Sequence, residues 1–169
     1  MTVGQANRLV KALVGEDDFH DVEDILASYY DIAQREIATT VSPIYRTVKV
    51  GCGVIAKLPK DLFRLISVDR GYERPDKTHI IAIGDGEATV GYYAYPAKLS
   101  DDAPQNAEFE VSDNAQSAIP YFAAAQTVLS DSDMRRYYAF MDMYNDILSN
   151  AASSESSIRI VRLEEGYGV

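Results

Sequence analysis

The chain has 169 residues, enough for one domain with a hydrophobic core and an excursion from it. Hydrophobic residues make up 47% and charged residues 25%, and these ordinary globular proportions exclude a disordered or fibrous chain. Sixteen Lys and Arg stand against 26 Asp and Glu, a formal net charge of −10. Proteins that bind nucleic acid through its phosphates usually have the opposite balance, so the charge argues against a DNA-binding module.

Cysteine and hydropathy exclude further classes of protein. Cys52 is the single cysteine, which rules out a disulfide framework and a cluster of thiolate metal ligands. No run approaches the roughly 20 apolar residues of a membrane span. The first residues have neither the basic nor the apolar region of a secretory signal. We therefore expect a soluble, acidic protein that is made inside the cell and has no membrane partner.

Apolar residues at helical spacing predict two helices at the beginning of the chain. The first covers 3–14, with Thr2 as its N-cap and Gly15 as its stop. The second runs from about 18 to 40, and no Lys or Arg occurs between residues 16 and 31. Acidic residues in the first turn of a helix complement its dipole, which accounts for most of them.

Between about 44 and 99 the pattern changes to short runs rich in Val, Ile and Tyr, separated by turn residues. This spacing predicts an antiparallel sheet of about four or five strands. The strands are expected at 45–50, 54–58, 62–68, 79–83 and 88–95. Asp85-Gly86 can supply the positive φ angles of a tight turn, so the last two strands are expected to form a hairpin.

After a polar, acidic connection, helical spacing returns at 115–129 and at 132–150. Pro120 requires either that the main helix begin near Ile119 or that a short turn precede a kink there. The remaining residues, 151–169, are expected to form a Ser-rich linker and then a strand with no partner nearby in the sequence. That strand comprises Ile158, Arg159, Ile160, Val161, Arg162 and Leu163.

These elements predict an α+β chain that is predominantly helical. We expect a small helical bundle with an inserted antiparallel β-region and an extended C-terminal tail. The domain boundaries are 1–150 for the folded domain and 151–169 for the tail.

Few residues can carry catalysis. Cys52 lies between two glycines, which is more typical of a small buried filler than of an activated thiolate. The only histidines are His20 and His79, and no Gly-rich phosphate-binding motif occurs. The sequence therefore predicts no catalytic residue, no cofactor and no enzyme activity.

One group has the composition of a metal site. Its members are Asp17, Asp18, His20, Asp21 and Asp24. His20 and Asp24 stand four residues apart, which would place them on one face of a helix. Oxygen-rich metal sites generally take ligands from several segments, whereas these residues all come from one segment. The other interpretation is therefore a helix start that faces solvent or a channel.

Four segments stand in a characteristic order along the chain. They are a Leu-Pro-x-Asp step within 57–68, a Tyr-x-x-Pro strand end within 91–99, an Asp before a Pro-containing helix at 112–121, and a Tyr-rich last helix around 136–144. In this order, over roughly residues 20 to 150, the chain resembles the head–tail connector (adaptor) proteins of tailed bacteriophages. The loop 70–77 and the tail after 150 lie outside the resemblance.

The resemblance implies a helical bundle with an inserted β-region, without catalysis. It implies a homo-oligomeric ring of about twelve subunits that is assembled in the host cytoplasm and resides in the virion neck. The ring would dock on the portal protein after DNA packaging, extend the DNA channel and present a platform to the next neck or tail protein. DNA would pass through it without sequence-specific binding.

Two sets of residues are candidates for these roles. The tail strand 158–163 could add to the sheet of a neighbouring subunit or of the portal, or could return to its own sheet. An acidic channel wall repels phosphate, and the acids expected to face the channel are drawn from 16–24 and from the connection. They are Asp17, Asp18, Asp21, Asp101 and Asp102, with Glu108 and Glu110 as further candidates.

Two alternatives remain open. Another neck or tail-completion ring, such as a stopper or a tail terminator, belongs to the same class, but those proteins tend to be richer in β structure. A small metal-dependent enzyme or regulatory domain built around His20 and the nearby acids belongs to a different class.

Overall fold

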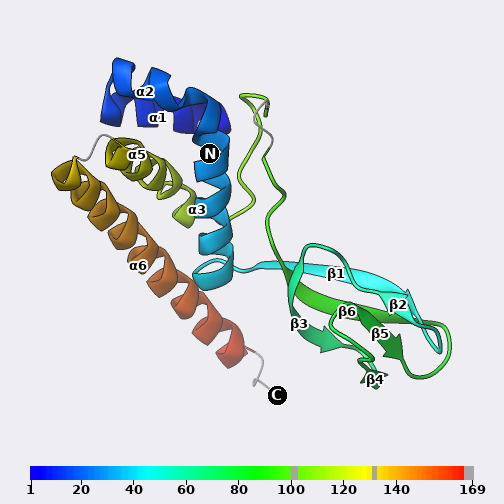
Figure 1. Ribbon diagram of the computed structural model, residues 1–169. Coiled ribbons are helices and arrows are strands. Elements are labelled where there is room, and N and C mark those ends of the chain that lie inside the picture. Colours follow the sequence, from blue (N-terminus) through cyan, green and yellow to red (C-terminus); the bar gives the residue numbers. More distant parts are fainter. Residues whose placement is uncertain (100–102, 131–132, 166–169) are drawn as a thin grey trace. The chain divides into compact units, whose positions relative to one another are not determined.

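The computed structural model describes residues 1–99, 103–130 and 133–165, with side chains as far as residue 153 (Figure 1). The chain divides into two compact units, a helical unit of Met1–Ser42 with Lys98–Val169 and a β unit of Pro43–Ala97. Helix accounts for about 49% of the residues, and strands account for a smaller share. The predicted mixed class, with an antiparallel β-region inserted into a helical chain, is therefore confirmed.

Helix α1 (Val3–Val14) begins and ends where the sequence predicts. Thr2 forms a capping box with Gln5, and Gly15 follows the last turn. The backbone N–H groups of Val3 and Gly4 donate to the carbonyl oxygens of Ala107 and Gln105, at 2.9 and 2.8 Å. The connection after the β unit thus satisfies helix-terminal donors that would otherwise lack partners.

The single helix predicted for 18–40 is wrong, because the segment is divided. It consists of α2 (Glu16–Val22), a 3₁₀ turn η1 (Glu23–Ile25) and α3 (Leu26–Thr40). The backbone leaves helical geometry at Val22 (φ −121°, ψ 0°) and again at Ile25 (φ −111°, ψ −4°). The 3₁₀ turn separates α2 from α3, and each of the two helices has its own buried apolar residues. The apolar spacing along the sequence does not reveal this bend.

Helix α5 (Ile119–Ser130) lies at the centre of the helical unit and contacts α1, α3 and α6. It is apolar on all sides, and its buried alanines at 123, 124 and 125 allow these neighbours to approach closely. The short helix α4 (Asp113–Gln116) precedes it. Pro120 occupies the first turn of α5, where its missing N–H has no helical partner to lose, so the predicted start near Ile119 is confirmed.

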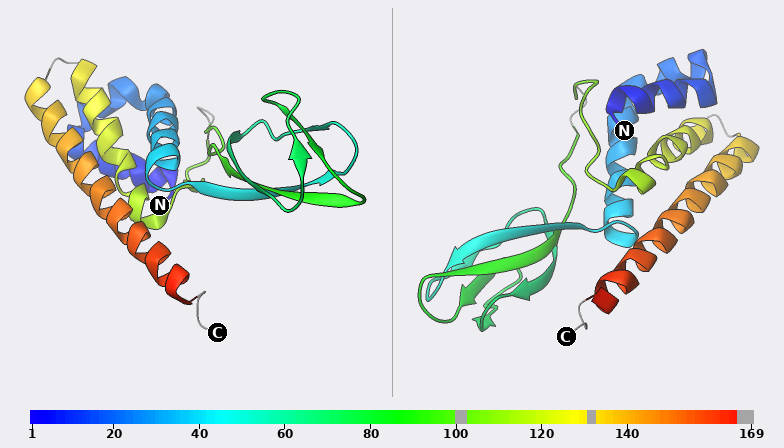
Figure 2. Two further views of the ribbon diagram at one scale, coloured as in Figure 1. Left: turned by 90° about the horizontal axis from the view of Figure 1, so that it is seen from below. Right: turned by 180° about the vertical axis from the view of Figure 1, so that it is seen from behind.

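Helix α6 (Met134–Glu165) has 32 residues and continues well past the end predicted at 150. Tyr144, Leu148 and Ala151 form its buried stripe, and its later turns extend beyond α5 (Figure 2). The strand predicted at 158–163 is wrong. No Gly or Pro occurs between Met134 and Glu165, so an established helix propagates through the Ala- and Ser-rich segment to Glu165.

The β unit contains two three-stranded antiparallel sheets instead of the single predicted sheet. One has the order β1 (Ile44–Gly51), β6 (Glu87–Ala94), β3 (Leu62–Val68); the other has β2 (Ala56–Lys57), β5 (His79–Ala82), β4 (Tyr72–Glu73). Both contribute to one core, whose buried members are Val50, Leu58, Ile80, Ala82, Ala88 and Val90. Ile44 pairs with Ala94, so the chain enters and leaves this unit through adjacent strand ends.

The hairpin predicted at 83–88 does not form, although its turn chemistry is present. Gly84 and Gly86 have φ angles of 114° and 80°, as a tight turn requires. However, β5 pairs with β2 and β4, whereas β6 pairs with β1 and β3. The turn therefore leads from one sheet to the other, and each of the two strands is the central strand of its own sheet.

Candidate interaction surfaces

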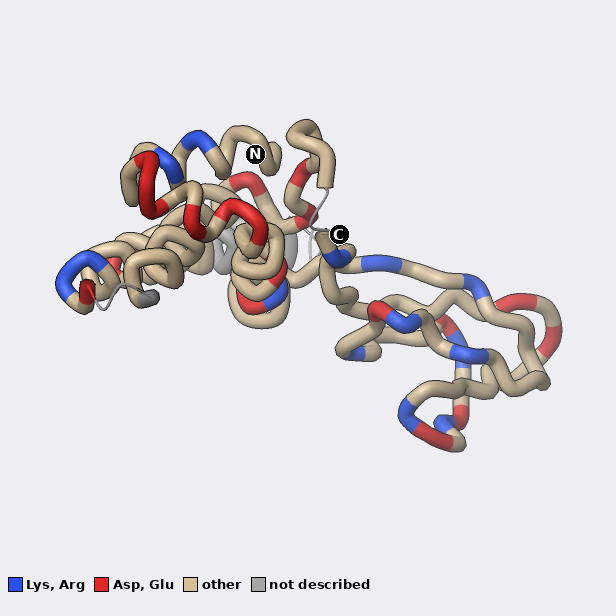
Figure 3. Tube along the Cα trace, turned by 45° about the horizontal axis from the view of Figure 1, so that its top comes forward, with Lys and Arg blue, Asp and Glu red and all other residues tan. Residues whose placement is uncertain are grey.

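The predicted acidic segment is an exposed edge of the helical unit, formed by α2 and η1 (Figure 3). Lys11 Nζ lies 2.7 Å from Glu16 Oε1, and this hydrogen bond lowers the pKa of the Glu16 carboxyl. Arg136 lies 3.2 Å from Asp18. In the part of the chain that the structure describes, Asp17, Asp21 and Asp24 have no ion pair, so this edge retains most of its negative charge.

The geometry does not support the metal-binding interpretation of this edge. Among the described residues, no group of three or more His, Cys, Asp and Glu side chains is placed to hold a metal ion. Asp24 lies in η1 and not in α2, so the helical spacing that paired it with His20 is interrupted. His20 Nδ1 is 3.9 Å from Glu23 Oε2, and both side chains are exposed.

The acids of the connection between the β unit and α4 lie apart from the acidic edge formed by α2 and η1. Asp101 and Asp102 lie outside the described residues. Glu108 is exposed and forms a backbone bridge with Thr2, at the beginning of α1, whereas Glu16 follows the end of that 12-residue helix. The ends of α1 are about 18 Å apart, so the acids at 16–24 and those near 108 are separated along this helix.

The segment predicted as a partner-binding strand is not a strand and therefore has no strand edge. Residues 158–163 belong to α6, where the backbone N–H and C=O groups bond to each other within the helix. Strand addition requires those groups to be available. Any partner contact of this segment in the observed conformation would therefore use a helix surface.

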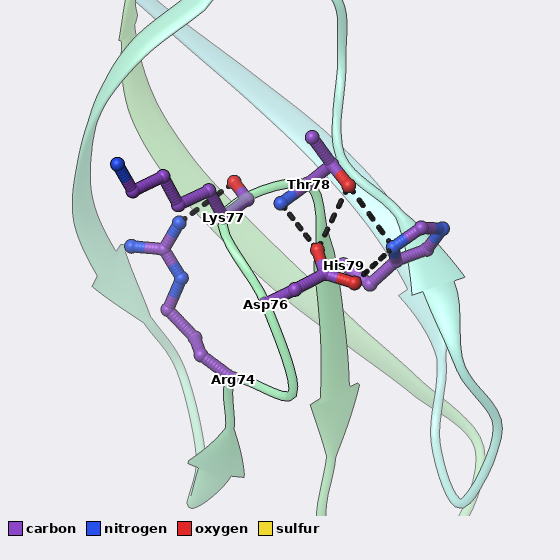
Figure 4. A network of polar contacts seen from close by, with 5 residues as sticks. All are labelled: Arg74, Asp76, Lys77, Thr78 and His79. Carbon is purple, nitrogen blue, oxygen red and sulfur yellow. Dashed lines mark hydrogen bonds and ion pairs between the residues drawn. The ribbon is translucent and has the colours of Figure 1, made fainter.

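A polar network in the β4–β5 loop has the composition of a catalytic triad but not its geometry (Figure 4). Asp76 Oδ2 and Thr78 Oγ1 approach the same nitrogen, Nδ1 of His79, at 2.8 and 3.1 Å. A proton relay needs the acid and the nucleophile on opposite ring nitrogens. Hydrogen bonds from Thr78, together with His79, lower the pKa of the Asp76 carboxyl, and the network orders the loop.

Cys52 packs against the β core at its half-buried margin. Arg70 Nη1 lies 3.3 Å from its sulfur and also donates to the Asp85 carbonyl oxygen at 2.8 Å. The same guanidinium contacts Asp69. Arg70 thus connects three segments of the β unit, a role that the sequence did not indicate.

The outer face of the β1-β6-β3 sheet carries an aromatic cluster, Tyr45, Phe63, Tyr93 and Tyr95. Ring centroids of Tyr45 and Tyr93 are 6.4 Å apart, those of Phe63 and Tyr93 are 6.0 Å apart, and those of Phe63 and Tyr95 are 5.2 Å apart. Tyr45 remains 56% exposed. The sequence pattern did not single out this face, although strand alternation places Tyr45 and Tyr93 on the side of the sheet away from the core-facing valines.

Gly91 is the small residue that makes room on the sheet for the Tyr45 side chain. It pairs with Thr47 on one side and with Ser67 on the other. A Cβ at this position would collide with the hydroxyl of Tyr45 and would lie 2.6 Å from that of Ser67. The Tyr45 side chain therefore lies across β6 above Gly91, which leaves the ring surface facing outward.

Charge is divided unevenly between the two units. The β unit holds eight Lys and Arg against six Asp and Glu, whereas the rest of the chain holds eight against twenty. Beside the aromatic cluster, Arg64 pairs in register with Tyr93, and Lys60 precedes Asp61, whose carbonyl oxygen accepts from the Tyr95 N–H at 2.7 Å. Neither cation forms an ion pair in the described part of the chain.

No protein-family model matches this chain, and no curated protein matches its sequence. Of the helices that the structure describes, none combines the length and the apolar character needed to cross a membrane.

Proposed function

We propose that the protein is the head–tail connector (adaptor) ring of a tailed bacteriophage, resident in the virion neck. The order of its parts carries this proposal. Three leading helical segments are followed by an inserted antiparallel β unit, an acidic connection and two closing helices. That is the order in which the sequence resembles the connector proteins, and the alternative stopper and tail-terminator rings are richer in β structure.

Exposed apolar side chains on both units support assembly. Ile55 in the β unit is 67% exposed, and Tyr138 on α6 is 60% exposed. Aromatic and aliphatic residues of this kind are enriched where subunits meet. In the proposed assembly, about twelve copies form a closed ring on the portal protein and present their other face to the next neck or tail protein.

The beginning of α2 fits a channel through which DNA moves without binding. Asp17 is exposed there, and its carboxylate repels phosphate instead of retaining it. No sequence-specific DNA contact and no catalytic step is part of this function.

The test is to image DNA-filled heads of the virus that encodes this protein, with and without added purified protein. We expect extra density at the portal vertex alone: a closed ring around an open channel, with the subunits related by rotation. Heads assembled without the portal protein are the control and should bind no ring.

Other results would contradict the proposal. Binding to isolated tails but not to portal-bearing heads would favour a tail terminator. Binding only to heads that already carry another ring would favour a stopper. A two-fold dimer with a closed centre, or no binding to any particle, would exclude a neck ring altogether.

A further inference from the structure

We infer that the outer face of the β1-β6-β3 sheet binds the acidic α2–η1 edge of a second copy of this chain. This inference deepens the proposed function, and it depends on that function only for the claim that the contact closes into a ring. The sheet face belongs to the β unit, and the acidic edge belongs to the helical unit.

The sheet face has the composition of an interface centre. The aromatic cluster 45, 63, 93 and 95 is packed ring against ring, which reduces the entropy that its side chains lose on binding. Tyr45 is 56% exposed, and Lys60 and Arg64 at the margin have no ion pair among the described residues. An apolar centre with a charged rim is the usual anatomy of a protein interface.

Charge complementarity identifies the occupant. The β unit has an excess of two positive charges, whereas the remainder of the chain has an excess of twelve negative charges. Within that remainder, the α2–η1 edge combines the carboxylates of Asp21 and Asp24 with the adjacent Ile25, which is 44% exposed. This edge therefore offers an apolar residue for the aromatic cluster and negative charge for Lys60 and Arg64.

The contact joins two different surfaces, and in a ring it is heterologous. When the sheet face of one copy binds the acidic edge of a second, the first copy keeps its acidic edge free and the second keeps its sheet face free, so further copies can add until the rotation closes. A two-fold dimer would make this contact twice and leave neither surface free, so it would stop at two copies.

Two charge-reversed variants test the inference. The sheet variant is Lys60→Glu/Arg64→Glu, and the helix variant is Asp21→Lys/Asp24→Lys. Each variant alone places like charges in the contact, so we expect self-association at least about tenfold weaker than in the unaltered chain. An equal mixture pairs the acidic sheet of one variant with the basic edge of the other, and we expect association to recover. Sedimentation equilibrium at several concentrations measures both effects.

Matched controls change the same number of charges elsewhere. Lys57→Glu/Lys77→Glu lies in the β unit but outside the β1-β6-β3 sheet, and Asp142→Lys/Asp146→Lys lies on the exposed surface of α6. Both controls should associate nearly as the unaltered chain does. Thermal unfolding verifies that every variant is folded, and only folded variants are compared.

Several outcomes would overturn the inference. They are an unaltered chain that stays monomeric up to its solubility limit, variants that associate normally, and a mixture that does not recover. If only the sheet variant changes binding to single-stranded DNA, while association is unaffected, the sheet face is a nucleic-acid surface. In each case a ring imaged on the portal would still support the proposed function, and a head without any ring would contradict only that function.

Discussion

At the scale of single residues, two buried tyrosines stabilise the helical unit while they are uncharged. Tyr30 is fully buried and donates from its hydroxyl to Asn7 Oδ1 at 2.8 Å. Tyr144 is also buried, between α5 and α6, and its ring lies 5.5 Å from that of Phe122. Burial raises the pKa of both hydroxyls, and the Glu36 carboxylate raises that of Tyr144 further.

We therefore predict alkaline destabilisation. The pKa of each tyrosine is higher in the folded than in the unfolded chain, so its stabilising effect is complete below about pH 10 and is lost as the pH rises above that. Above pH 10 the free energy of unfolding should fall by up to about 1.4 kcal/mol per pH unit for each tyrosine. Tyr30→Phe and Tyr144→Phe should each reduce this slope in urea titrations, whereas the exposed Tyr138→Phe should not. Equal slopes in all variants would contradict the prediction.

Asp76 gives the opposite sign at acid pH. Its carboxylate accepts from the Thr78 backbone N–H at 2.6 Å and from the Thr78 hydroxyl at 2.8 Å. These bonds hold its pKa below the ordinary value, so the stabilisation is present above about pH 4 and is lost as the pH falls below it. Asp76→Asn should lower the thermal midpoint at pH 6, and the difference should shrink towards pH 3. Asp85→Asn is the control, and a pH-independent difference for Asp76→Asn would disprove the assignment.

At the scale of elements, Arg136 joins the beginning of α6 to the end of α1. Its guanidinium donates to the carbonyl oxygens of Leu13 and Val14 at 3.0 and 2.9 Å and pairs with Asp18. These carbonyls at a helix C-terminus would otherwise lack intrahelical partners.

Arg136→Ala should therefore destabilise the helical unit by about 1–3 kcal/mol in chemical unfolding, since partly buried acceptors lose their donor. Arg136→Lys should recover only part of the loss, because an ammonium cannot reproduce the planar arrangement of donors. The neighbouring Arg135→Ala removes the same charge from an exposed side chain and should be nearly neutral. Equal effects of the two alanine variants would show that charge alone matters.

The continuity of α6 is a second prediction at this scale. Ser156→Pro places a proline inside the helix beyond its last described buried residue, Ala151. We expect a loss of helical circular dichroism with little change in the thermal midpoint, because the interruption lies after Ala151 and leaves the described buried stripe of α6 intact. Ser149→Pro, before Ala151, should lower both. An unchanged helical signal in Ser156→Pro would mean that residues 151–165 are not helical in solution.

At the scale of the whole molecule, we predict that the proposed assembly depends on ionic strength, because the chain has a net charge of −10. Repulsion between the acidic helical units acts over the Debye length, which shortens from about 30 Å at 0.01 M salt to about 10 Å at 0.1 M. Attractive contacts between charges a few ångströms apart are screened much less. The yield of rings should therefore rise over this range of salt, in light scattering without the portal or in binding to portal-bearing heads. A yield independent of salt would contradict the prediction.

Local signals in the sequence were sufficient for elements that are determined by neighbouring residues. Thr2, Gly15 and Pro120 place helix ends through capping, termination and the missing N–H, and all three are found where expected. The glycines at 84 and 86 likewise mark a turn. Each of these signals acts within a few residues, so no distant contact is needed to interpret it.

The residues of the candidate interaction surfaces were harder to predict from the sequence. The acids at 17 and 21 are exposed as their composition indicates, but the bend at Val22 removes Asp24 from their helix. The aromatic cluster brings together residues up to 50 positions apart, Tyr45 and Tyr95 among them, through the register of β1, β6 and β3. Such register is decided by which face of the sheet is buried, which a short window cannot reveal.

The sequence by itself determined the acidic balance, the helical ends of the chain, the inserted β-region and the residues that begin and end most helices. Only the tertiary structure decided that the Gly84–Gly86 turn joins two sheets, that 18–40 bends at Val22, and that 158–163 continues a helix. Capping and turn preferences are local energies, of about 1 kcal/mol each. Strand partners, bends and the surfaces left exposed follow from burying apolar area contributed by distant segments, and that larger energy is set by the folded chain as a whole.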